Sequence, residues 1–101
     1  MYTDGSKKIN GVGAAVWDES KKYSLTYKLP DEINIYVAEG FAIWKSLGYA
    51  MLINQRKILV LTDSESVLKS IQSSYKKSFS AHPIILEIIY SIQILQLMGN
   101  I

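Results

Sequence analysis

Tyr2-Thr3-Asp4-Gly5-Ser6 opens this chain and predicts a short strand that ends in a turn and exposes one carboxylate. Asp-Gly is a common turn pair, so an ordinary hairpin turn is a competing interpretation. Two later carboxylates, Glu39 and Asp63, stand in places where an acid is out of character with its surroundings. The three acids together favour a functional role for Asp4.

The composition is that of one small globular domain. With 101 residues, 49% of them hydrophobic, residues 1–101 can form a single domain with a real core. The absence of cysteine excludes disulfides, thiolate metal sites and cysteine nucleophiles, and favours an intracellular location, in cytoplasm or nucleus. A net charge of +2 permits an anionic partner. No secretion signal is present, and the apolar residues 83–98 are too short and too interrupted to span a membrane.

Three antiparallel strands are expected before residue 30. Asn10-Gly11 is a strong hairpin signal, and the small apolar residues 12–17 predict an inner strand with one closely covered face. Residues 23–28 alternate large apolar with polar side chains, which is the period of a strand with one wet face. Pro30 ends this meander.

A helix is expected over residues 35–51, with Asn34 as its cap. At helical spacing Glu39 shares a stripe with apolar residues, among them Tyr36, Ala42 and Ile43. A buried, unpaired carboxylate costs several kcal/mol. Either a salt bridge or hydrogen bond at the rim of the core, or a functional site, must therefore compensate Glu39.

Residues 57–63 predict a strand buried on both faces, which is typical of a parallel strand in an α/β sheet. Asp63 is its last residue, and ligands bind beyond the carboxyl ends of such strands. Ser64 can cap the helix that follows, from Glu65 to about Ser73. Taken alone, Asp63 is equally well a turn or capping residue.

Residues 73–82 predict a polar loop that carries Lys76 and Lys77 between aromatic residues. Such a loop is either a solvated connector or a contact for a phosphate backbone. His82 is interpreted as a residue at the start of a helix and not as a catalytic group. Pro83 suits the first turn of that helix, which should run to about Met98.

At this point the chain resembles the ribonuclease H domain (type 1), especially that of retrotransposon reverse transcriptases. Four segments carry the resemblance, which covers nearly the whole chain: Thr3-Asp4-Gly5-Ser6, Ala38-Glu39, Leu61-Thr62-Asp63-Ser64 and His82-Pro83-Ile84. The resemblance implies an α/β fold with a mixed sheet of strand order 3-2-1-4, in which the fourth strand is parallel to the first and helices pack on the sheet.

The resemblance also implies a function. Asp4, Glu39 and Asp63 would be the catalytic and metal-binding acids, with Mg²⁺ as cofactor and Mn²⁺ as an alternative ion. The reaction would be endonucleolytic hydrolysis of the RNA strand of an RNA–DNA hybrid, which is the expected partner. Substrate contacts would come from Gly5, Ser6, Ser64, Lys76 and Lys77.

The departures from the family are informative too. Members continue into a fifth strand, a histidine-bearing loop and a last helix with a fourth acid, whereas this sequence stops at Ile101. The expectation is a domain that is incomplete at its C-terminus, belongs to a larger polyprotein, holds one ion where the family holds two, and has impaired activity. The exposed strand edge would favour self-association. Ile35 and Tyr36 replace the paired asparagines of bacterial members.

Two other functions stay open at this point. One is a non-catalytic scaffold or nucleic-acid-binding domain of the same fold, like the connection domains of reverse transcriptases. The other is a piece of an actin-like phosphotransferase, whose sheet also begins with an Asp-Gly turn. Retention of all three acids favours the nuclease over the scaffold, and the lack of a second phosphate loop disfavours the phosphotransferase.

Overall fold

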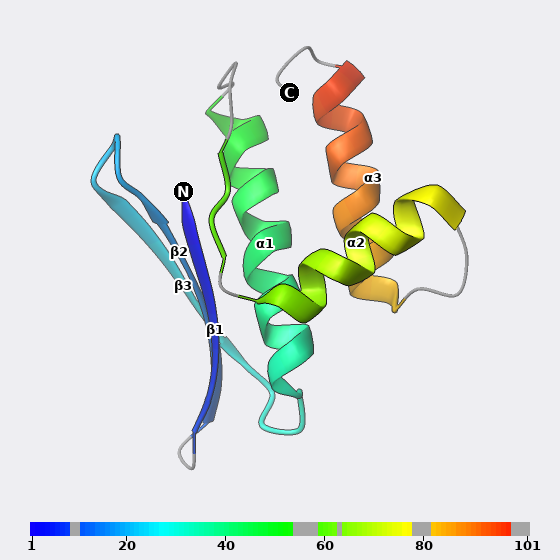
Figure 1. Ribbon diagram of the computed structural model, residues 1–101. Helices are drawn as coiled ribbons and strands as arrows, with labels where there is room; N and C mark the ends of the chain where they lie inside the picture. Colours follow the sequence, from blue (N-terminus) through cyan, green and yellow to red (C-terminus); the bar gives the residue numbers. More distant parts are fainter. Residues whose placement is uncertain (9–10, 54–58, 63, 78–81, 98–101) are drawn as a thin grey trace.

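The computed structural model describes residues 1–8, 11–53, 59–62, 64–77 and 82–97. The elements in chain order are β1 (Tyr2–Lys8), β2 (Gly11–Asp18), β3 (Tyr23–Leu29), α1 (Ile35–Leu52), α2 (Glu65–Lys77) and α3 (Pro83–Leu97). Figure 1 shows the sheet on one side of α1 and the two later helices on the other. The long helix α1 is therefore the central layer.

The three strands form an antiparallel sheet of order β1-β2-β3, as the sequence predicts. The expected turn at Asp4-Gly5 is wrong. Asp4 and Gly5 lie within β1 and pair with Ala15 and Ala14 of β2, so their backbone belongs to the ladder. The strand continues to Lys8, whose partner is Gly11, and the chain reverses between these two residues.

A first core lies between the sheet and α1. Along β2 alternate residues are buried, which places Val12, Ala14 and Val16 on the face that α1 covers. Ala38 and Ala42 of α1 pack against this face. The small side chains on both elements allow the helix to lie close to the strand.

A second core lies on the other side of α1. Its buried members come from all three helices: Ile43, Leu47, Val67, Ile84, Ile85, Ile88 and Leu95. The helix expected over residues 35–51 is confirmed as α1, which has an apolar core on each side. Asn34 accepts a hydrogen bond from the backbone N–H of Val37 at 2.9 Å, which confirms its capping role.

Residues 59–62 run beside β1, on the edge away from β2. Tyr2 and Leu61 form one parallel bridge, in which the Thr3 N–H donates to the Leu61 carbonyl at 2.9 Å and the Leu61 N–H donates to the Met1 carbonyl at 2.7 Å. The expectation of burial on both faces is wrong for the described part, because Leu59 is 69% and Leu61 40% exposed. Of these residues, Val60 packs against the second core. A complete fourth strand stays a prediction.

The second helix, α2, is longer than expected. It ends at Lys77 and not near Ser73, so Lys76 and Lys77 belong to a helix and not to a loop. The reason lies in the sequence, where Val67, Ile71 and Tyr75 recur at intervals of four and continue the helical pattern by another turn.

The third helix begins at Pro83 as predicted. His82 supports this beginning, since its Nδ1 accepts a hydrogen bond from the Ile84 N–H at 3.1 Å. Among the described residues, no helix has the length and apolar character that crossing a membrane requires.

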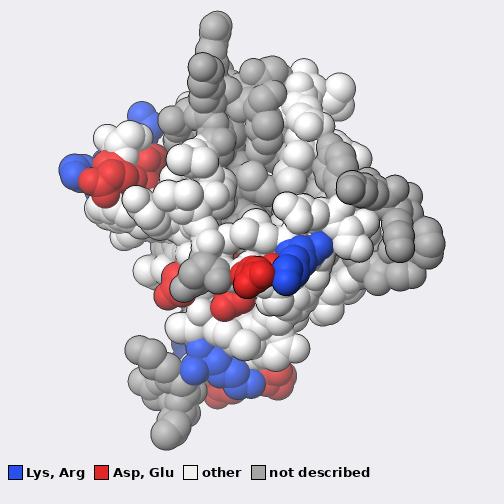
Figure 2. Space-filling model, in the orientation of Figure 1, with Lys and Arg blue, Asp and Glu red and all other residues white. Residues whose placement is uncertain are grey.

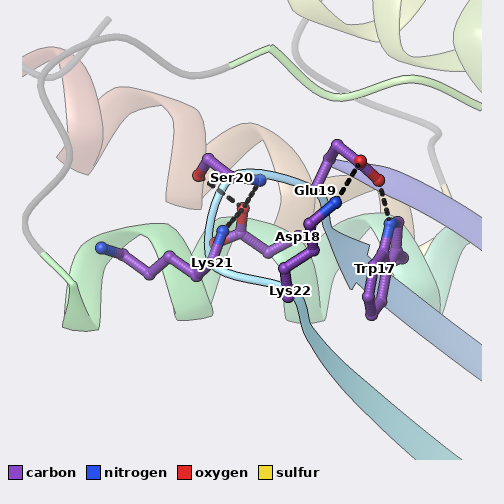
Figure 3. Close-up of polar contacts among 6 residues, drawn as sticks. All are labelled: Trp17, Asp18, Glu19, Ser20, Lys21 and Lys22. Carbon is purple, nitrogen blue, oxygen red and sulfur yellow. Dashed lines mark hydrogen bonds and ion pairs between the residues drawn. The ribbon is translucent and has the colours of Figure 1, made fainter.

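The turn between β2 and β3 is built around a buried carboxylate (Figure 3). Asp18 is 4% exposed and accepts hydrogen bonds from the Ser20 N–H at 3.1 Å and the Ser20 hydroxyl at 2.9 Å. The Lys21 N–H and the Tyr49 hydroxyl of α1 donate to the same carboxylate. Burial raises the pKa of Asp18, but the hydrogen bonds outweigh burial and hold the pKa below its ordinary value.

Candidate active site

Asp4 lies in the middle of β1 with its side chain exposed. Its neighbours Thr3 and Gly5 are buried on the face that α1 covers. Because successive side chains of a strand point to opposite faces, Asp4 projects from the face of the sheet away from α1. The strand therefore presents a carboxylate to solvent from a position whose backbone is paired with Ala15 of β2.

Gly5 is the point of closest approach between the sheet and α1. A Cβ on Gly5 would lie 2.4 Å from the Glu39 nitrogen and 2.5 Å from the Ala38 carbonyl carbon. Such distances exclude any side chain, because the atoms that it would meet are helix backbone. Because Gly5 has no side chain, the backbone of Glu39 lies directly against Gly5, the residue after Asp4.

Glu39 is half-buried in the first turns of α1. On its other flank, a Cβ at Gly40 would lie 3.2 Å from two carbons of Ile84 of α3. The turn that carries Glu39 is consequently wedged between β1 and α3. Within the described part of the chain, neither Asp4 nor Glu39 forms an ion pair, so a salt bridge, one of the alternatives for Glu39, is not among the described contacts.

An open pocket of about 480 Å³ lies between β1 and residues 59–62. Its lining consists of Tyr2, Thr3, Asp4, Leu61 and Thr62. The pocket brings the first predicted acid next to the segment that leads to Asp63. Asp63 itself lies outside the described residues.

Ser64 precedes α2 as predicted, and its carbonyl accepts the N–H of Leu68 at 3.2 Å. Its own N–H donates to the Thr62 hydroxyl at 3.1 Å. The Ser64 side chain is buried, and its hydroxyl has no hydrogen-bond partner among the described residues. Ser64 therefore holds the cap position, while its Oγ makes none of the described capping hydrogen bonds.

The other predicted contacts are spread more widely. Ser6 is half-buried in β1 and pairs with Gly13. Lys76 and Lys77 end α2, and their side chains lie outside the described part of the structure.

Figure 2 shows acidic side chains on the face where β1, α1 and the start of α2 approach one another. In α2, the Lys69 ammonium pairs with the Glu65 carboxylate at 3.0 Å, and both side chains are well exposed. No cluster of three potential metal-ligating side chains occurs among the residues that the structure describes, a set that does not include Asp63.

The pocket-lining residues Tyr2, Leu61 and Thr62 were not predicted as part of the site. Each of them stands within two residues of a predicted acid, and that proximity was the one signal in the sequence. Their meeting depends on pairing between segments 58 residues apart, which no local pattern reveals.

Comparison with known proteins identifies a family and a fold. The sequence matches the reverse transcriptase-like family over residues 2–96. No curated protein matches it.

Two solved structures are similar in fold. The N-terminal RNase H domain of Rv2228c from Mycobacterium tuberculosis, solved as a fusion with maltose-binding protein, has a TM-score of 0.68 and 22% identity over 97% of this chain and 73% of that chain. RNase H1 from the halophilic archaeon Halobacterium salinarum NRC-1 has a TM-score of 0.61 and 16% identity over 98% of this chain and 76% of that chain. The chain therefore belongs to the reverse transcriptase-like family and has a ribonuclease H-like fold.

Proposed function

We propose that this domain hydrolyses the RNA strand of RNA–DNA hybrids as a metal-dependent endonuclease, with Asp4, Glu39 and Asp63 as its catalytic acids. The observation that carries the proposal is the contact of Gly5 with the backbone of Ala38 and Glu39. This contact brings two of the three motif segments together. The parallel bridge between Tyr2 and Leu61 brings the third alongside.

The donor set suits a hard divalent ion. Carboxylate oxygens are the ligands that Mg²⁺ prefers, and Mn²⁺ accepts the same ligands. Asp4 is exposed and Glu39 half-buried, and neither has an ion-pair partner among the described residues, so both remain available to a cation. Asp4, Glu39 and Asp63 would hold the metal, which in such sites activates water and stabilises the leaving oxygen.

The protein's own part is to hold the acids and to admit the hybrid. Rigid pairing of β1 fixes Asp4, and the wedged turn of α1 fixes Glu39. The hybrid would be recognised through its shape and its 2′-hydroxyl groups. We propose Ser6, Lys76 and Lys77 as contacts near its path, whereas Gly5 and Ser64, which are buried, would act by positioning β1 and the start of α2.

The test is metal binding by matched variants. In calorimetric titration with Mg²⁺, Asp4→Asn should weaken binding by about tenfold or more, because it removes a direct ligand and not merely an outer-sphere partner. Asp31→Asn is the control, since Asp31 is an exposed carboxylate between β3 and α1. Equal binding by Asp4→Asn and the unaltered protein would refute the role of Asp4.

A second measurement separates the enzyme from a scaffold. A hybrid with a labelled RNA strand should be cleaved in Mg²⁺, and cleavage should stop in EDTA and in the Asp4→Asn variant. Binding of the hybrid without metal-dependent cleavage would instead identify a non-catalytic domain of the connection type.

A further inference from the structure

A second surface lies between β3 and α1, separated from β1 by the width of the sheet. It is a groove of about 470 Å³ that we call the aromatic groove. Its walls include Tyr23 and Tyr27 from β3 and Lys45, Gly48, Tyr49 and Leu52 from α1. We propose that the aromatic groove binds single-stranded nucleic acid, a function beyond the hybrid cleavage proposed for the acids near β1.

The groove contains a pair of stacked rings that are held in place. The rings of Tyr23 and Tyr49 have centroids 5.9 Å apart and planes inclined by 24°. The Tyr49 hydroxyl donates to the buried carboxylate of Asp18 at 2.9 Å, and this hydrogen bond fixes the orientation of the Tyr49 ring. Tyr23 is 50% exposed, so part of this aromatic surface faces solvent. Exposed, oriented rings are platforms on which bases stack irrespective of sequence.

The groove also contains one cation. The Lys45 ammonium lies 4.6 Å from the ring centroid of Trp44, 5.4 Å from that of Phe41 and 5.5 Å from that of Tyr27. These rings hold the ammonium by cation–π contacts, and Lys45 forms no ion pair with a described residue. None of the described residues that line the groove is acidic. The charge of the groove thus complements an anion.

The groove has open space over Gly48, where no neighbouring residue packs against helix α1. A Cβ added at Gly48 would meet no atom within 4 Å, although glycine is less favourable than alanine inside a helix. Leu52, at the end of the same wall, is 86% exposed. The open space over Gly48 and the uncovered Leu52 side chain fit a ligand with an apolar, flat part.

The ring faces can stack on a base, and the Lys45 ammonium beside them can pair with the phosphate next to that base. The volume lies in the range of small-ligand sites and is sufficient for about one nucleotide. An acidic peptide could also satisfy Lys45, but the stacked ring pair favours a base, because stacking is the main sequence-independent contact of single strands.

The test measures the fluorescence anisotropy of a dye-labelled eight-nucleotide oligothymidylate, because emission from Trp44, which packs against Lys45, overlaps with that of Trp17. Tyr23→Ser and Lys45→Gln should each weaken binding of the oligonucleotide by about fivefold or more, as expected for a lost stacking or phosphate contact. Tyr23→Phe keeps the ring and should bind like the unaltered protein. Gly48→Leu should fill the groove and weaken binding while helix α1 remains folded.

Matched controls come from elsewhere on the surface. Tyr90→Ser removes a ring of α3 that is 61% exposed, and Lys28→Gln removes an exposed lysine of β3 that does not line the groove. Both variants should bind normally. Because no variant alters Asp4, Glu39 or Asp63, hybrid cleavage reports on the proposed catalytic function separately.

Three outcomes would overturn the proposal: no binding of the oligonucleotide, equal binding by all variants, or equal affinity for the octamer and for thymidine monophosphate. The last outcome would show a mononucleotide site in place of a strand site. Binding of an acidic peptide that is lost in Lys45→Gln, without any response to the oligonucleotide, falls under the first outcome and would assign the groove to a protein partner.

Discussion

Asp18 is a buried carboxylate whose charge is stabilised without a cation. Its hydrogen-bond donors are two backbone N–H groups and the hydroxyls of Ser20 and Tyr49. One residue thereby closes the turn between β2 and β3 and ties this turn to α1. Glu19 beside it accepts from the Trp17 indole at 2.6 Å and pairs with Lys22 at 2.9 Å (Figure 3), but both ionic groups are exposed and contribute little.

Asp18 should make stability depend on pH at the acid end. Its pKa in the folded protein lies below the ordinary value of 3.8, so its contribution is present above that value and is lost as pH falls through the folded pKa. In urea unfolding, the advantage of the unaltered protein over Asp18→Asn should be constant near neutrality and shrink below about pH 4. Parallel stability curves down to the acid limit would contradict this role.

At the scale of elements, the contact of β1 with α1 sets the geometry of the site. Gly5 permits it on one side of the helix, and Gly40 permits the approach of Ile84 on the other. Gly48, in the same helix, has no such neighbour. The three glycines thus differ in what a methyl group would meet, although all three belong to elements with regular hydrogen bonding.

Gly5→Ala and Gly48→Ala form a matched pair with opposite expected effects. Gly5→Ala should lower the free energy of unfolding by about 1–3 kcal/mol or more, because its methyl group would collide with helix backbone. Gly48→Ala should raise that free energy by about 0.5–1 kcal/mol, as an unhindered glycine-to-alanine change in a helix does. Chemical denaturation measures both, and a Gly5→Ala protein as stable as the original would disprove the close contact.

At the scale of the whole molecule, the layers leave an apolar edge beside β1. Tyr2 is 52%, Leu59 69% and Leu61 40% exposed, and the bridge between Tyr2 and Leu61 keeps them together. Of the described helices, α1 alone packs broadly on the sheet. We propose that this edge mediates self-association, since uncovered edges with apolar side chains favour pairing.

Sedimentation over a range of concentrations tests self-association. Leu59→Lys should weaken it by about tenfold or more, because burial of one leucine contributes roughly 1.5–3 kcal/mol. Leu97→Lys alters a more exposed leucine, 89% accessible, on α3 and serves as the control. If both variants associate like the original protein, the edge is not the interface.

The sequence alone determined the features that depend on neighbouring residues. The inner strand over residues 12–17, the side chain of Asn34 as a cap and Pro83 at a helix start are local preferences, and the structure confirms each of them. The three motifs in order were sufficient to identify the family, because they are read directly from the residues.

Tertiary structure decided what depends on distant segments. Asp4-Gly5 has the sequence of a turn, yet pairing with β2 keeps it extended. Packing against α1 leaves no room for a side chain at Gly5, a requirement that no local pattern predicts. Leu59 and Leu61 have the sequence of a buried strand, yet their position at an edge exposes them. Local sequence specifies the preference of a backbone, whereas burial and close approach are set by the element that packs against it.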